Sequence, residues 1–536
     1  MKEFCFIIAI VLWCCSCKNS NSSRINTLRD TTITPTNSFS ELFLDSAKLE
    51  DFIAERKLGD SAANRMRNFY NSRNYNFAWF TKEGLAEQAL AFWNLHNNYI
   101  QLSNDSSFIN KRLHEQMALL INEDSRVKIT SNEISKTELQ LTEHFFEYAQ
   151  YAYAGKINPE ELQWHILRKK VNAMALLDSL IATQGQNIEE WEPVNRQYNL
   201  MKNELKRYND IKKSGTWQVI SLGNKKTYKQ GDSAIAVKYI KQRLASTGDY
   251  NANDTLQTFT NDLLVAVKRA QKRFGLNENG IIDETLIKSL NVPVSTRIEQ
   301  LLINMERMRW MPKEPEANRI IVNIPEFKLH VIENGKKAFD MNIVVGTAAN
   351  STVIFNDVLK YVVFSPYWNI PRSIVRNEIF PAMQRNRNYL SARNMEQTGF
   401  SNGLPVIRQK PGGSNALGLV KFIFPNSYNI YFHDTPSKSL FNRDKRAFSH
   451  GCIRLAEPKK MAEYLLRNQT EWTLGKIKEA MHASKEKWVT LKEPVPVFIS
   501  YLTTWVSSDG LLNFREDVYG HDKKMAERLF EQVKVN

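Results

Sequence analysis

One short run of residues contains the side-chain types needed for nucleophilic attack on a carbonyl carbon. Cys452 lies in the run Ser449-His450-Gly451-Cys452-Ile453-Arg454, and His433 lies upstream of it. A cysteine attacks as its thiolate, so it needs a base or a cation nearby to lower its pKa from about 8.5. The sequence therefore makes Cys452 a candidate nucleophile, and burial as a small apolar side chain is the alternative.

Two histidines are candidates for that base. His433 ends the apolar run 428–432 and is followed by Asp434-Thr435-Pro436, which places its imidazole where a strand meets a loop. His450 is two positions from Cys452. It would share a face with the cysteine in an extended strand but not in a turn, and the spacing leaves both arrangements open.

Gly451 adds a backbone feature to this group. A glycine can adopt conformations closed to other residues, and that freedom would let the N–H groups of Gly451 and Cys452 point at a developing oxyanion. No Cys/His cluster with metal-ligand spacing occurs in the sequence.

The N-terminus has the composition of an export signal followed by a tether. Residues 4–13 form an apolar stretch of about ten residues behind a lysine, which is too short to span a bilayer. The stretch ends in Cys14-Cys15-Ser16-Cys17, which resembles a lipoprotein cleavage site with Cys17 as the lipidated first residue. We therefore predict a lipoprotein signal peptide over residues 1–17 and a flexible tether over 18–40. A plain secretion signal is the alternative.

Composition limits the remaining possibilities. Four of the five cysteines lie in the predicted leader, so a mature chain would keep Cys452 as its only unlipidated thiol and could form no disulfide framework. The net charge of +15 is scattered without a basic stripe, which favours an anionic envelope polymer over nucleic acid as partner. A length of 536 residues predicts two to four domains.

The spacing of apolar residues changes along the chain and defines the expected domains. Apolar residues at three- and four-residue steps predict a helical scaffold domain over residues 41–215. Three short helices, the third capped by Asp283, predict a small module over 228–293. Residues 317–536 alternate in the manner of strands, with Asn334-Gly335 as a hairpin turn, and predict a mostly β domain.

Two segments differ from the domains that contain them. Residues 373–413 read as helix and loop inside the β domain, which makes them a candidate lid. Residues from Lys485 onward read as a closing strand pair and tail. The aromatic cluster at 69–75, with Trp79 and Phe80, is expected to be core. The predicted fold class is multidomain α+β: a helical N-terminal scaffold, a small three-helix module and a mostly β domain with an inserted helical lid.

These motifs resemble those of a known family. His433, fifteen residues and then Ser449-His450-Gly451-Cys452 is similar to the signature of L,D-transpeptidases with the YkuD-type catalytic domain. Arg454 replaces the final asparagine of the short form of the motif, as in the large, YcbB-like members. Residues 228–293 resemble the peptidoglycan-binding domain of wall hydrolases and transpeptidases. Further segments that resemble the large members are 304–310, 323–327, 365–371, 408–412, 415–418 and 431–436.

The resemblance implies a thioester mechanism. Cys452 would attack the L-centre carbonyl of a diamino-acid residue in a tetrapeptide stem, and the terminal D-alanine would leave. A side-chain amine of a second stem would then take the acyl group and give a 3-3 cross-link. His433 would take the thiol proton, and the amides of Gly451 and Cys452 would hold the oxyanion. The resemblance implies no metal and no organic cofactor.

The resemblance also implies substrate-binding roles. Tyr431 would help to hold the oxyanion, Arg454 would bind a stem carboxylate through its planar guanidinium, Trp368 would line the donor groove, and His450 would contact the substrate. For Arg454 a structural ion pair is the alternative. The implied partners are peptidoglycan stem peptides and a membrane reached through the lipid anchor at Cys17, with no nucleic acid. Protein partners, and the choice between inner and outer membrane, are left open.

Three other functions remain compatible with the motifs. Water in place of the acceptor amine would make the protein an L,D-carboxypeptidase, and a protein amine would make it attach a protein to the wall. A non-catalytic wall-binding scaffold is the third, although the intact pair of His433 and Cys452 argues against it. In each case the expected location is the periplasm, with the chain anchored as a lipoprotein.

Overall fold

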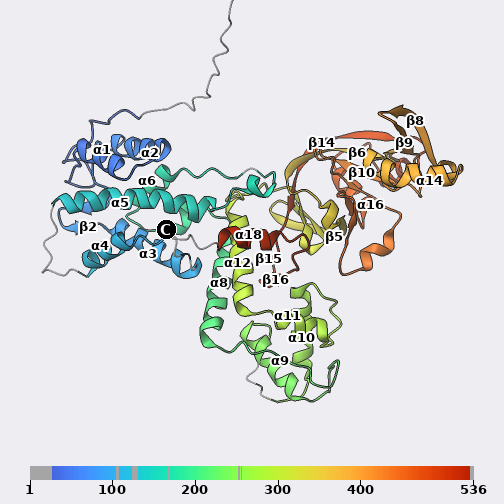
Figure 1. Cartoon of the computed structure of the whole chain (residues 1–536), viewed down its shortest axis with the longest axis horizontal. Helices are drawn as coiled ribbons and strands as arrows, with labels where there is room; N and C mark the ends of the chain where they lie inside the picture. Colours follow the sequence, from blue (N-terminus) through green and yellow to red (C-terminus); the bar gives the residue numbers. More distant parts are fainter. Residues whose placement is uncertain are drawn as a thin grey trace, which may run out of the picture. The chain divides into compact units, whose positions relative to one another are not determined.

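The computed structural model describes most of the chain (Figure 1): residues 27–103, 105, 108–122, 131–166, 168–250, 254 and 256–530. The predicted signal peptide over 1–17, the lipidation site Cys17 and the start of the tether lie outside these residues. The chain forms two compact units, of which the first takes in residues up to 95, 110–147 and 172–191, and the second takes in the rest. Within the described ranges, no helix is long and apolar enough to cross a membrane.

The first unit is helical, as the apolar spacing predicts. Phe69, Tyr70 and Trp79 are fully buried, which confirms that this aromatic cluster is core. The elements of the N-terminal part of the chain are α1 (Ser46–Glu55), α2 (Asp60–Asn71), β1 (Phe80–Thr81), β2 (Gly84–Leu85), α3 (Glu87–Ser103), α4 (Lys111–Ile121), α5 (Ser131–Ala149), α6 (Ala173–Ala182) and α7 (Ile188–Trp191).

The region predicted as one helical scaffold is divided between the two units. Residues 148–171 and helix α8 (Arg196–Ser214) belong to the second unit. There α8 packs on α12 (Val294–Arg309), and Arg309 donates a hydrogen bond to the hydroxyl of Tyr198 at 3.0 Å. A helical period predicts an apolar face but does not say which element covers it.

The small module has the three helices that the sequence predicts. Ile240, Val267 and Leu286 are among the buried residues of its own apolar core. Asp283 caps the third helix by accepting a hydrogen bond from the Leu286 N–H, as expected. The helices are α9 (Ile235–Ser246), α10 (Asn261–Phe274) and α11 (Glu284–Leu290).

The β domain is built on a nine-stranded sheet with the order β12-β5-β13-β11-β10-β6-β14-β3-β4. Strand β4 also pairs with β5, so eight of these strands close into a ring. Asn334 and Gly335, with φ of 50° and 74°, form the predicted turn between β4 and β5. The strands are β3 (Arg319–Asn323), β4 (Lys328–Glu333), β5 (Lys336–Gly346), β6 (Asn356–Phe364), β10 (Val420–Ile423), β11 (Phe432–His433), β12 (Ala447–Ser449), β13 (Ile453–Leu455) and β14 (Lys487–Ser500).

Helices and a strand pair complete this domain. The predicted closing strand pair exists as β15 and β16, whereas β14 lies inside the ring between β6 and β3. Apolar side chains of the sheet and of the helices after β13 form one buried cluster. The elements are α16 (Pro458–Leu465), α17 (Leu474–Met481), β15 (Thr504–Val506), β16 (Leu512–Phe514) and α18 (His521–Leu529).

The insertion after β6 differs from its prediction in its second half. Helix and loop were expected throughout, but β8 and β9 form a hairpin and pair with β7 in a three-stranded sheet. Asn402 and Gly403, with φ of 44° and 75°, form its turn. Most of β8 is exposed, so no alternating apolar pattern signals this strand. The elements are β7 (Trp368–Asn369), α13 (Arg372–Ile374), α14 (Phe380–Arg385), α15 (Tyr389–Ala392), β8 (Met395–Ser401) and β9 (Leu404–Gln409).

One buried side chain ties the two ends of the insertion together. Asn415 is fully buried, and its Nδ2 donates to the carbonyl oxygens of Pro366 at 3.1 Å and Lys410 at 2.9 Å. Pro366 precedes the insertion's first strand, and Lys410 follows its last. The insertion therefore leaves and rejoins the β domain at one point.

Candidate active site

Two short parallel strands gather four predicted site residues. His433 on β11 lies opposite Arg454 on β13. One residue earlier in the same register, Tyr431 lies opposite Cys452, and the Tyr431 carbonyl oxygen accepts the Ile453 N–H at 3.2 Å. Opposite residues of paired strands point to the same face of a sheet. Cys452, Tyr431, His433 and Arg454 therefore share one face.

The Cys452 thiol is half-buried directly before β13. Its Sγ lies 3.5 Å from the carbonyl oxygen of Asn429, which accepts the S–H. Burial raises the pKa of this thiol, while hydrogen bonds from the backbone N–H and the hydroxyl of Tyr431, and the charge of Arg454, oppose that increase. The thiol is consequently protonated at neutral pH, so attack on a carbonyl requires a base.

His433 has the properties of such a base. Its side chain is 4% exposed, and its Nδ1 lies 2.5 Å from the carbonyl oxygen of Asp434. Because a carbonyl can only accept, Nδ1 holds the proton and Nε2 remains free to take one. Burial, and then the positive charge of Arg454, lower the pKa of His433 to about 4. The imidazole is therefore neutral across the physiological range.

Gly451 holds the turn before the cysteine in a conformation that favours glycine, with φ of 114°. Its carbonyl oxygen accepts from Thr352 Oγ1 at 2.8 Å, and its N–H donates to Ser449 Oγ at 3.2 Å. That N–H is thus engaged by Ser449 in this structure, and its predicted role as an oxyanion donor stays a prediction. The Cys452 N–H has no acceptor among the described residues and remains the candidate donor. Sequence reasoning missed Thr352, since nothing in the spacing links positions 99 residues apart.

We expect Gly451→Ala to impair the site through the backbone. An added Cβ would lie 3.9 Å from the nearest atoms, the carbonyl oxygens of Asn350 and Ser351, so space is available. The positive φ would still cost about 1–3 kcal/mol. Relaxation of the turn would displace the thiol and lower kcat/KM by about 10²-fold. Gly413→Ala, at an ordinary φ with nothing within 4 Å, is the matched control. Equal kcat/KM for the two variants would contradict this account.

His450 does not share the face of Cys452. It lies in the bend between β12 and β13, is exposed, and places its Nε2 3.4 Å from Oε1 of Glu378 in the insertion. Of the two arrangements that the sequence leaves open for His450, the structure therefore has the turn. This geometry leaves His433 as the base candidate, and substrate contact by His450 stays a prediction.

The other two predicted substrate contacts lie in different surroundings. The Nε of Arg454 is buried without a hydrogen-bond partner in the described part of the chain, and no ion pair of this residue is found there. Trp368 lies on β7, half-buried against a cluster within the insertion that includes Ile370, Val375 and Ile379. Arg454 is thus available to an anionic ligand beside the thiol, whereas Trp368 belongs to the packing of the insertion.

The lowered pKa of His433 predicts a loss of stability in acid. Between its ordinary value of 6.5 and about 4, the unfolded chain binds a proton that the folded chain excludes. The free energy of unfolding therefore falls as pH falls through this window, by about 3 kcal/mol in full. Denaturant unfolding of wild type and His433→Gln at pH 7 and 4 measures this, and the variant should lose less stability. Equal losses would contradict it.

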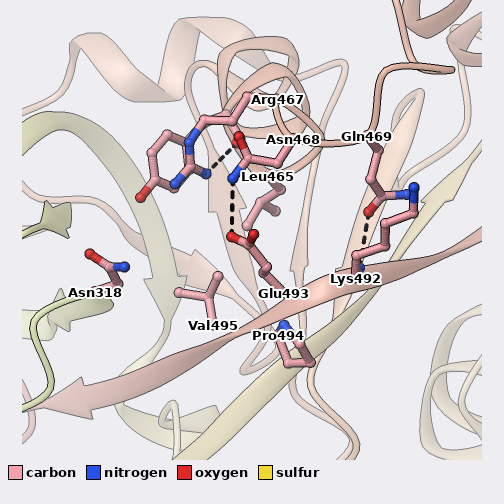
Figure 2. A pocket seen from close by; sticks show the side chains of 10 residues that line it. Asn318, Leu465, Arg467, Asn468, Gln469, Lys492, Glu493, Pro494 and Val495 are labelled. Atoms are coloured by element: carbon pink, nitrogen blue, oxygen red, sulfur yellow. Dashed lines mark hydrogen bonds between the residues drawn. The ribbon is translucent and has the colours of Figure 1, made fainter.

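A pocket lies elsewhere on the β domain, beside the end of α16 and the middle of β14 (Figure 2). Its polar groups pair with one another. Asn468 Nδ2 donates to Glu493 Oε2 at 3.1 Å, and the Lys492 N–H donates to Gln469 Oε1 at 3.1 Å. None of the predicted site residues lines this pocket. We assign it no role in the reaction.

A protonated thiol and a neutral, buried imidazole lie on one face of a closed sheet, an arrangement that is chemically suited to acyl transfer through a cysteine. Comparison with known families gives its class: residues 317–497 match the YkuD-type "L,D-transpeptidase catalytic domain". Residues 64–205 match a "Scaffold domain", and residues 233–290 match the "Putative peptidoglycan binding domain". The chain therefore carries an L,D-transpeptidase catalytic domain and a peptidoglycan-binding domain, which confirms the resemblance and the predicted fold class.

One relative and two solved structures are similar to parts of this chain. A protein of Haemophilus influenzae named "Putative L,D-transpeptidase" is 30% identical over 268 residues, which are 46% of this chain and 54% of the relative. The match thus spans about half of that relative's length. An L,D-transpeptidase structure from Xylanimonas cellulosilytica is 12% identical over 52% of this chain and 100% of its own, with a TM-score of 0.17. One from Stackebrandtia nassauensis is 14% identical over 51% and 94%, with a TM-score of 0.22.

Proposed function

We propose that this protein is an L,D-transpeptidase that forms 3-3 cross-links between peptidoglycan stems through a thioester on Cys452. The observation that carries the proposal is the pairing of a protonated thiol with a neutral His433 on the same face of the sheet. A neutral imidazole can take the thiol proton at the moment of attack and return it to the leaving group. The catalytic-domain match at 317–497 supports the same reaction class.

In the first half-reaction, the Cys452 proton passes to Nε2 of His433 while sulfur bonds to the carbonyl carbon of the third stem residue. The oxyanion that forms accepts a hydrogen bond from the Cys452 N–H, with the Tyr431 hydroxyl close to the sulfur. The bond to D-alanine then breaks, and the histidine proton leaves with the D-alanine amine. The thioester remains on the enzyme.

In the second half-reaction, a side-chain amine of another stem attacks the thioester carbonyl. Its excess proton passes to His433, the carbon–sulfur bond breaks, and the sulfur recovers the proton. An amide joins two diamino-acid residues, and the enzyme is restored. Water in the place of the amine would give a shortened stem, which is the carboxypeptidase outcome.

The test is a product analysis. Purified protein incubated with disaccharide-tetrapeptides should yield dimers whose masses and fragments show 3-3 linkage, with release of D-alanine. Shortened monomers without dimers would replace the proposal with hydrolysis. Absence of any product, from protein shown to be folded by its thermal transition, would refute both.

Arg454 is proposed to bind the free carboxylate of the donor stem. Its buried, unpaired Nε and its position opposite His433 support this role. Because a hydrogen bond to a charged group contributes about 1.5–3 kcal/mol, Arg454→Met should raise the donor KM about 10- to 100-fold with a smaller effect on kcat. A donor with that carboxylate amidated is the control, since wild type and variant should then differ little. An equal loss on both donors would contradict the role.

The cellular setting is part of the proposal. Two domains that act on or bind peptidoglycan indicate a cell-wall, periplasmic location. Lipid attachment at Cys17, substrate contacts by His450 and Trp368, and closure of the 373–413 insertion over the site complete the hypothesis. Radiolabelled palmitate should be incorporated by the wild-type protein in cells but not by Cys17→Ala, and equal labelling of both would exclude the anchor.

A further inference from the structure

A line of accessible side chains runs from Cys452 across four further strands. In the registers of the sheet, Tyr431 lies opposite Cys452, Ile423 opposite Tyr431, and Tyr361 between Ile423 and Thr490. Opposite residues point to the same face, so the five side chains form one row. Each of them is half-buried or exposed. We call this row, Cys452–Tyr431–Ile423–Tyr361–Thr490, the open track.

Across β11, β10 and β6, the neighbouring row of side chains on the same face is buried. It contains His433, Lys421 and Val363, which are 4%, 9% and 0% exposed. At the root of the insertion, the Tyr367 N–H donates to Glu486 Oε1 at 3.0 Å, and Lys421 Nζ lies 3.2 Å from the same oxygen. The open track is therefore bordered by a buried row where it crosses β11, β10 and β6.

An exposed indole lies at the far end of the open track. Trp488 is on β14, two residues before Thr490, and it is 53% exposed. Its Nε1 donates to Glu486 Oε2 at 2.8 Å, and its ring meets Tyr361 edge-on with centroids 5.8 Å apart. The ammonium of Lys421 lies 5.3 Å from the ring centroid. Three neighbours thus fix the ring while half of its surface stays open to a ligand.

Two residues next to this indole carry hydroxyl groups: Tyr361, whose ring contacts it, and Thr490, which lies opposite Tyr361. Those of Tyr361 and Thr490 have no hydrogen-bond partner among residues 27–530 as far as the structure describes them. An indole face takes up an apolar surface, and hydroxyl groups donate to or accept from polar substituents around it. A pyranose ring, with an apolar C–H face and polar groups at its edge, has this combination.

The distance from the nucleophile fits a sugar attached to the stem. Neighbouring strands lie about 4.8 Å apart, so the path along the sheet surface from β13 to β14 takes four steps and covers about 19 Å. The three stem residues up to the attacked carbonyl span about 10 Å when extended. The sugar that carries the stem would occupy the rest of that length.

We propose that Trp488, with Tyr361 and Thr490, binds a sugar ring of the glycan strand that carries the donor stem. This inference rests on the proposed function, because it takes the donor to be a peptidoglycan stem. The open track would hold the stem peptide between the thiol and the indole. The enzyme would thereby recognise glycan-linked stems in preference to free peptides.

The kinetic test compares two donors, a disaccharide-tetrapeptide and the same tetrapeptide without sugar. Trp488→Ala should lower kcat/KM for the disaccharide donor about tenfold, as truncation of an aromatic anchor does, and leave that for the free peptide unchanged. Trp488→Phe should restore most of the loss. Lys487→Ala, an exposed neighbour that points to the opposite face, is the matched control.

A binding measurement separates this inference from the proposed reaction. In full-length protein bearing Cys452→Ala, calorimetry should show tighter binding of the disaccharide-tetrapeptide than of the tetrapeptide, and adding Trp488→Ala should remove about tenfold of that preference. Equal effects of Trp488→Ala on both ligands, or no effect on either, would overturn the sugar site. Absence of 3-3 dimers with this preference intact would overturn the proposed reaction instead.

Discussion

Cys452→Ala is expected to abolish acyl transfer completely within the detection limit of the assay. The nucleophile forms the only covalent bond between enzyme and substrate in the proposed reaction, and the β domain contains no second cysteine. Loss of a catalytic nucleophile in a comparable triad lowers kcat by about 10⁶-fold. The variant should still fold, because the side chain is small and half-buried and its bond to the Asn429 carbonyl oxygen is long, at 3.5 Å.

The measurement is adduct mapping together with product analysis. A carbapenem incubated with wild-type protein should add its mass to the peptide that contains Cys452, and Cys452→Ala should remain unmodified. The four other cysteines all lie in the first 17 residues, so no other cysteine of the β domain can be labelled. A wild-type Cys452 that stays unmodified in folded protein, or a Cys452→Ala variant that still forms dimers, would refute the nucleophile.

His433→Gln is expected to lower kcat/KM by about 10²- to 10⁴-fold at pH 7, the usual contribution of a general acid-base group. Burial raises the pKa of Cys452, so the unassisted thiol is almost wholly protonated at this pH. Without the imidazole, the rate should follow the thiolate fraction and rise about tenfold per pH unit toward the thiol pKa. The wild type should respond weakly to pH above about 5, because its imidazole is already neutral.

His482→Gln is the matched control, since this exposed histidine of the same domain donates from Nδ1 to the Lys478 carbonyl oxygen at 2.8 Å. Its pH profile should match that of wild type. Parallel pH profiles for wild type and His433→Gln would show that the imidazole does not take the thiol proton. The alternative role would then be orientation of the neighbouring strand.

Much of the site could be predicted from the sequence because its residues are close along the chain. The run around Cys452 and the strand-end position of His433 follow from local patterns, and the Asn334-Gly335 turn follows from two residues. Partners contributed by distant strands were not accessible in this way. Thr352 donates a hydrogen bond to the Gly451 carbonyl oxygen, but no spacing pattern in the sequence links the two residues. The open track likewise becomes visible only once the pairing of the β strands is known.

The errors have physical causes. An Asn402-Gly403 turn was the one signal for the hairpin of the insertion, because its exposed first strand needs no alternating apolar pattern. The Gly451 N–H is predicted to face the oxyanion because glycine permits such a conformation, and in this structure it donates to the Ser449 hydroxyl, which the sequence pattern did not indicate. The conformational freedom of a glycine shows which directions its N–H can take, whereas the nearby acceptors determine which hydrogen bond that N–H makes.

The asparagine tie at the base of the insertion has a consequence for how such proteins can diversify. Asn415 holds both ends of the insertion at one point, so the segment between them can be replaced without interrupting the ring of strands. Its length and surface can change, or be exchanged by grafting, without altering the strands that carry Cys452 and His433. Selectivity can then evolve separately from the bond-forming chemistry.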